Sequence, residues 1–135
     1  MEKEEQKKEE KKTAIDEIKL LGIDILIKPD KKPNEVIKVI NAVEKLMKEN
    51  ANALTYTQMR NIYGIIQKTN DFIELHRARP RIAYIQARQD GNGKKLVGFF
   101  ADIMKLVEDV NQFNEFKQLM ESVVAYHKLY EKKKN

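Results

Sequence analysis

The chain has 135 residues, of which 41% are hydrophobic and 35% are charged, so it is long enough for one domain with a hydrophobic core. It contains no cysteine, which excludes disulfides, thiolate metal sites and cysteine nucleophiles and gives no reason to expect an oxidising compartment. No apolar run approaches the roughly 20 residues that span a bilayer, and residues 1–12 lack the apolar segment of a signal peptide. We therefore expect a cytoplasmic protein with a flexible charged N-terminal tail, residues 1–12, and a helical-bundle domain, residues 13–135.

The positive charge of the chain is concentrated in one stretch. Residues 60–95 contain eight lysines and arginines and three acids, and their net charge of +5 equals that of the whole chain. All five arginines fall within this stretch, whereas the lysines are spread throughout. Arginine is suited to bidentate phosphate contacts and to stacking on bases. The distribution therefore points to nucleic acid.

Apolar residues recur at helical spacing along most of the chain. The first segment is ambiguous, because apolar positions from 15 to 25 fit a helix whereas residues 23–27 also have strand character. Two prolines and an aspartate predict a loop at residues 28–33. The remaining predicted helices are residues 35–50, 56–73, 80–89, 94–110 and 112–131.

Local signals support these boundaries. Thr55 and Gln58 have the spacing of a capping box. Pro80 is a favoured first helical residue, and residues 90–93, Asp-Gly-Asn-Gly, predict a turn. The residues predicted to form the core are Leu96, Phe99, Phe100, Ile103, Phe113, Phe116, Met120 and Val123. The expected fold is all-α, a single-domain helical bundle of five to six helices.

The sequence gives no pattern of a catalytic or metal site. The two histidines, His76 and His127, are far apart and have no paired carboxylate spacing. No Gly-rich phosphate loop or zinc-protease motif is present, and residues 90–93 lack the ligand spacing of a calcium loop. We therefore expect no enzyme, no metal and no cofactor.

Two groups of basic residues have a spacing that places each group on one helix face. Arg60 and Lys68 flank Gly64 at intervals of four. A glycine inside a helix costs about 1 kcal/mol relative to alanine, so Gly64 indicates close approach of a backbone, either from nucleic acid or from a neighbouring helix of the bundle.

The second group is Arg81, Tyr84 and Arg88, spaced to share one face of the predicted helix 80–89. An aromatic ring between two arginines is typical of single-strand nucleic-acid binding. The alternative is a solvated basic stripe whose tyrosine packs into the core. The other basic residues nearby favour the nucleic-acid interpretation.

Three parts of the chain form a recognisable set. They are Leu54–Tyr63, Arg79–Arg88, and the pair Phe113–Phe116 and Glu121–Lys128. In this order and spacing they resemble the small subunit of the type III-A (Csm) CRISPR effector complexes, over roughly residues 54–130. Gln86 stands where a small residue is expected and Met59 replaces a branched aliphatic residue, but neither departure affects a basic position.

The resemblance implies a non-catalytic RNA-binding subunit of the effector, repeated along a guide RNA paired with target RNA. Its implied partners are these two RNAs, neighbouring copies of itself, the large polymerase-like subunit and the backbone subunits. No membrane association and no cofactor are expected. Arg60, Arg81 and Arg88 occupy matching motif positions. The full set of candidate RNA-binding residues is Arg60, Lys68, Arg79, Arg81, Tyr84, Arg88, Lys94 and Lys95.

Two other functions fit the same residues. One is a helical protein–protein adaptor whose basic face binds an acidic partner without nucleic acid. The other is a small DNA-binding protein, which is disfavoured because no arrangement of a recognition helix is evident.

Overall fold

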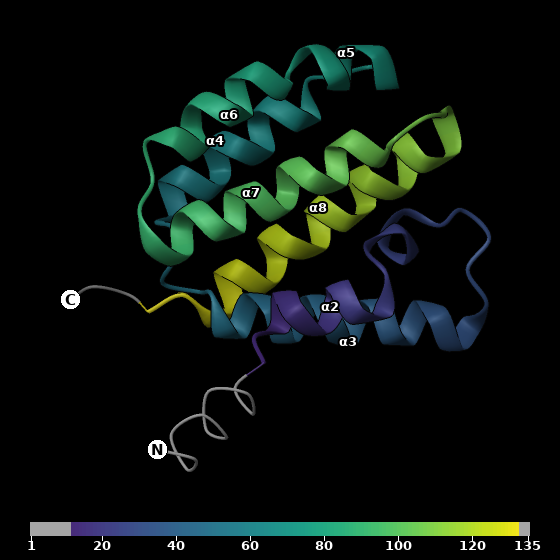
Figure 1. Cartoon of the computed structure of the whole chain (residues 1–135), viewed down its shortest axis with the longest axis horizontal. Helices are drawn as coiled ribbons and strands as arrows, with labels where there is room; N and C mark the ends of the chain where they lie inside the picture. Colours follow the sequence, from purple (N-terminus) through teal and green to yellow (C-terminus); the bar gives the residue numbers. More distant parts are fainter. Residues whose placement is uncertain (1–11, 133–135) are drawn as a thin grey trace, which may run out of the picture.

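The computed structural model describes residues 12–132, and every regular element in that range is a helix (Figure 1). The expected N-terminal tail, apart from Lys12, lies outside the described residues. The elements are α2 (Ala14–Leu21), the 3-10 helix η1 (Ile23–Ile27), α3 (Pro33–Glu49), α4 (Tyr56–Gln67), α5 (Phe72–Arg77), α6 (Arg79–Ala87), α7 (Gly91–Leu106) and α8 (Val110–Tyr130). The predicted all-α, single-domain bundle is confirmed.

The helices are arranged in three layers around α8 (Figure 1). The middle layer is α7 and α8, and α8 packs against α3 on one side and α4 on the other. The layer with α4 also contains α5 and α6, and α6 packs along α7. On the opposite side, α2 lies against α3. Of the helices within residues 12–132, none is both long and apolar enough to cross a bilayer.

The core lies where the three layers meet. All eight residues predicted to form it are at most 4% exposed, which confirms that prediction. The middle layer supplies the largest of these side chains, Phe100 and Phe116. Both are enclosed because α7 and α8 are covered on two sides.

The ambiguous first segment is a short helix followed by a 3-10 turn. Thr13 and Asp16 form a reciprocal capping box that begins α2. Gly22 ends α2 with a φ of 101°, a conformation that favours glycine. Residues 23–27 then form η1, in which Leu26 and Ile27 are buried. Their apolar run reflects burial on one side of a tight helical turn and not a strand.

The prediction of a single helix over residues 56–73 was wrong at its C-terminal end. The capping box of Thr55 and Gln58 begins α4 as expected, but α4 ends at Gln67. The Thr69 hydroxyl donates to the Ile66 carbonyl at 2.6 Å. The Asp71 side chain then accepts from the backbone N–H of Glu74 at 2.8 Å and begins α5. These two side chains satisfy backbone groups that a continuous helix would have paired.

The predicted turn at residues 90–93 was also wrong. Gly91, Asn92 and Gly93 form the first turn of α7, which follows Asp90. A Cβ at Gly93 would lie 2.7 Å from the carbonyl oxygen of Ala53, in the segment between α3 and α4. Glycine at this position therefore lets the start of α7 pack directly against backbone.

Candidate nucleic-acid interface

A groove of about 640 Å³ between α4 and α6 brings together Arg81, Tyr84 and Arg88. These side chains lie on one side of α6 because of their spacing in the helix, while Ile82 on the opposite side is fully buried. The remaining lining residues are Gln58, Asn61, Ile65, Pro80, Ile85 and Gln89. Among the described residues, no acid lines the groove. It is therefore a cationic surface with polar and apolar walls.

Tyr84 is an exposed ring in this groove. Its side chain is 64% exposed, so the alternative in which it packs into the core is wrong. The guanidinium carbon of Arg88 lies 5.6 Å from the ring centroid, within the range of a cation–π contact. The arginine and the tyrosine therefore form one continuous aromatic and cationic surface.

The arginines have no carboxylate partners in the described part of the chain. All salt bridges among residues 12–132 are made by lysines. Arg60, Arg81 and Arg88 are exposed. Glu44, a conceivable partner for Arg81 or Arg88, instead accepts a hydrogen bond from the Tyr130 hydroxyl at 2.6 Å. A guanidinium that is exposed and unpaired keeps its N–H donors available for phosphate oxygens.

Arg60 does not line the groove. It lies about 100° around α4 from Asn61, which does line it. The guanidinium carbon of Arg60 is 5.9 Å from the centroid of the Tyr56 ring. Lys128 of α8 reaches the same ring, with its Nζ at 4.5 Å. Arg60, Tyr56 and Lys128 therefore form a second cluster, where α4 meets α8. Because Lys128 also forms a salt bridge with Glu131 at 2.8 Å, Arg60 is the one cation of this cluster without a carboxylate partner within residues 12–132.

Gly64 lies on the outer side of α4 between Arg60 and Lys68. Within the described residues, a Cβ added at Gly64 would meet no atom within 4 Å. The alternative in which Gly64 permits a tight helix–helix contact inside the bundle is therefore wrong. Lys68 is exposed at the end of α4, so this side of the helix presents two basic residues around an open backbone position.

Arg79 is engaged within the bundle. It is half-buried, and its Nη1 donates to Nδ1 of His76 at 3.3 Å. Nε2 of His76 in turn lies 2.6 Å from the Val107 carbonyl oxygen and donates to it. These bonds tie α5 and α6 to the end of α7. Arg79 therefore lies outside the groove and has a structural partner.

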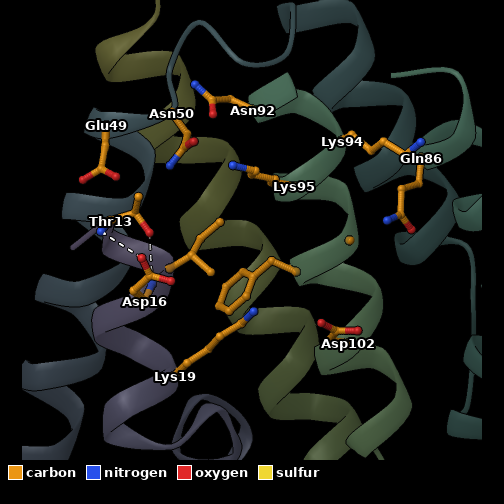
Figure 2. Close-up of a pocket in the computed structure, with 13 residues that line it drawn as sticks. Thr13, Asp16, Lys19, Glu49, Asn50, Gln86, Asn92, Lys94, Lys95 and Asp102 are labelled. Atoms are coloured by element: carbon orange, nitrogen blue, oxygen red, sulfur yellow. Dashed lines mark hydrogen bonds between the residues drawn. The ribbon is translucent and has the colours of Figure 1, made fainter. Parts of the chain in front are cut away.

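Lys94 and Lys95 belong to a different pocket, of about 510 Å³, at the start of α7. Figure 2 shows Lys95 directed toward Asn50 and Lys94 directed toward Gln86. The charged residues that line this pocket are balanced, three basic and three acidic: Lys19, Lys94 and Lys95 with Asp16, Glu49 and Asp102. This pocket is therefore less suited to a phosphate than the groove.

One of those acids is held in its charged form. The pKa of Asp16 is lowered, first by the hydrogen bonds from the side chain and backbone of Thr13 and to a smaller extent by Lys19 and Lys95. The carboxylate of Glu49 accepts the backbone N–H of Ala14 at 3.0 Å. Asp16 thus caps the start of α2, and Glu49 joins α2 to the end of α3. Lys95 lines the same pocket as these two acids.

The sequence did not single out Gln58 or Asn61 as site residues. Both line the groove from α4, and the amide oxygen of Gln58 also accepts the backbone N–H of Thr55 at 2.9 Å. Neither side chain is charged, so the distribution of basic residues in the sequence gives no indication of them. The helix pairing that places them opposite Tyr84 is a tertiary feature.

Comparison with models of protein families matches residues 30–133 to the family described as Csm2 Type III-A. No curated protein and no solved structure matches the chain. The family match covers more than half of the chain and contains the three segments that carried the resemblance, as well as both helices of the groove. The chain therefore belongs to the Csm2 type III-A family, the small subunits of the Csm CRISPR effector complexes.

Proposed function

We propose that this Csm small subunit is a non-catalytic RNA-binding protein that repeats along the guide RNA and its target RNA and holds them through the groove between α4 and α6. The observation that carries the proposal is the cationic lining of this groove. Arg81 and Arg88 are exposed, have no carboxylate partner within residues 12–132 and share the groove with no acid. In the second cluster, Arg60 adds one more exposed arginine without a carboxylate partner within residues 12–132.

Binding of this kind recognises phosphate and overall shape. Arginine contacts to phosphates release counterions and give an affinity that does not depend on base sequence. Sequence specificity then comes from pairing between guide and target. In this proposal the subunit acts in the cytoplasm and contacts neighbouring copies, the large polymerase-like subunit and the backbone subunits, while catalysis belongs to those other subunits.

The test is titration of the isolated protein with single-stranded RNA at several salt concentrations. We expect weak binding whose log affinity falls linearly with log salt, and equal affinity for unrelated sequences. A preference beyond about a hundredfold for one sequence, about 2.7 kcal/mol, contradicts the proposal. Absence of RNA binding at low salt favours the adaptor that uses the basic face for an acidic protein.

A further inference from the structure

We infer that the groove between α4 and α6 is a subsite for an unpaired nucleobase, which stacks on Tyr84 while Arg81 and Arg88 hold the adjacent phosphates. The inference rests on the proposed RNA binding and adds that the strand must be locally single-stranded where it enters the groove. The ligand is thus a nucleotide with a free base face, not the backbone of a continuous duplex.

Tyr84 is the most exposed aromatic residue among residues 12–132, at 64%. The next, Tyr56, is 38% exposed and lies beside two cations, Arg60 and Lys128. Tyr84 is adjacent to one cation, Arg88, and the residue remains mostly exposed. Stacking of a base on an exposed aromatic ring is tolerant of sequence, because every base has a π-face.

The two arginines are placed on either side of the ring along α6. Arg81 precedes Tyr84 by three residues and Arg88 follows it by four, so their backbones are about 10 Å apart along the helix axis. On a strand whose base stacks on Tyr84, the phosphates before and after that base are then each within reach of one of these long side chains. Both guanidiniums are exposed and lack carboxylate partners in the described part of the chain.

The opposite wall of the groove suits a base without selecting one. On α4, Ile65 offers apolar contact and the amide of Asn61 is able both to donate and to accept a hydrogen bond. Ile85, on α6 beside Tyr84, adds apolar surface. The volume of about 640 Å³ lies in the range of sites that enclose a small organic ligand. The pocket that contains Lys94 and Lys95 is of similar size, but its three acids oppose a phosphate. This contrast assigns the nucleotide to the groove of Tyr84.

A continuous duplex cannot use this subsite, because both faces of each base are covered by stacked neighbours. The isolated protein should therefore bind a single strand more tightly than a perfect duplex of the same length. The experiment uses the full chain, a short RNA that carries a fluorescent adenine analogue quenched by stacking, and the same RNA with abasic positions.

For the unmodified protein we expect quenching on binding and an affinity about tenfold lower for the abasic strand, within the range of one stacking contact. Tyr84→Ala should abolish the quenching and lower the affinity for the normal strand by the same factor, with the salt slope unchanged. Tyr84→Phe should retain both the quenching and the affinity for the normal strand. Circular dichroism confirms that each variant is folded.

Tyr56→Ala is the matched control, because Tyr56 is also an exposed tyrosine beside an arginine but lies outside the groove. It should retain the quenching. RNA binding with equal affinity for the normal and abasic strands, or an equal loss of quenching from Tyr56→Ala and Tyr84→Ala, would overturn the subsite while leaving RNA binding intact. Absence of all RNA binding would overturn the proposed function itself, and the subsite with it.

Discussion

Nε2 of His127 lies 3.0 Å from the carbonyl oxygen of Leu54 and donates a hydrogen bond to it. His127 is on α8 and is fully buried, whereas Leu54 directly precedes Thr55, the capping residue of α4. The bond therefore joins the end of the central helix to the start of a helix that lines the groove. Nδ1 of the same ring has no partner within residues 12–132.

This contact gives the first prediction. His127→Leu removes the donor and leaves the Leu54 carbonyl buried and unpaired, so the free energy of unfolding should fall by about 1–3 kcal/mol. His127→Gln retains a donor and should recover part of the loss. Urea denaturation followed by circular dichroism measures both. If His127→Leu is as stable as the unmodified protein, the bond does not stabilise the fold.

The second prediction concerns the core. Phe99→Ala or Phe116→Ala should each lower the free energy of unfolding by about 3–5 kcal/mol, because each removes a buried aromatic side chain. The control is Leu129→Ala on α8, where the side chain is 65% exposed and the expected change is within about 0.5 kcal/mol. Losses below about 1 kcal/mol at both phenylalanines would show that this stripe does not hold the bundle together.

The third prediction is that alanine has opposite effects on stability at two glycines of the chain. Gly64→Ala should stabilise the free protein by up to about 1 kcal/mol, because the helix gains a better former and the new Cβ meets no described atom within 4 Å. Gly93→Ala should destabilise it by about 1–3 kcal/mol, because its Cβ would crowd the Ala53 carbonyl.

The Gly64→Ala variant also tests whether RNA approaches the outer surface of α4. If a phosphate backbone approaches Gly64 closely, Gly64→Ala should weaken RNA binding even though it stabilises the free protein. Thermal unfolding and an RNA titration of one preparation measure both effects. Unchanged RNA affinity would show that nothing approaches this side of the helix.

The fourth prediction concerns the electrostatics of the groove. Arg81→Ala or Arg88→Ala should leave the fold intact and reduce the salt slope of RNA binding by about 0.7–1. Arg81→Glu should weaken binding further through repulsion. Lys38→Glu, an equal charge change at an exposed residue of α3, is the control. Its helix, α3, lies in the outer layer opposite to that of α6 (Figure 1). Equal losses of RNA affinity from Arg81→Glu and Lys38→Glu would show that only net charge matters.

The sequence by itself determined the helical class and most of the core. The capping box of Thr55 and Gln58 and the apolar periodicity around Phe99 and Phe116 are local signals, because caps and one-sided burial are decided within a few turns of helix. The spacing of Arg81, Tyr84 and Arg88 likewise placed them on one face without knowledge of the tertiary structure.

Only the tertiary structure decided which helices meet and which faces they leave open. It placed Arg60 toward Lys128 and away from the groove, engaged Arg79 with His76, and placed Lys95 among acids. Each of these outcomes depends on residues distant in the sequence or on the packing of neighbouring helices. Helical spacing shows that a charge lies on a given face, but the electrostatic environment of that face comes from the neighbouring helices, and their identity depends on how the whole core packs.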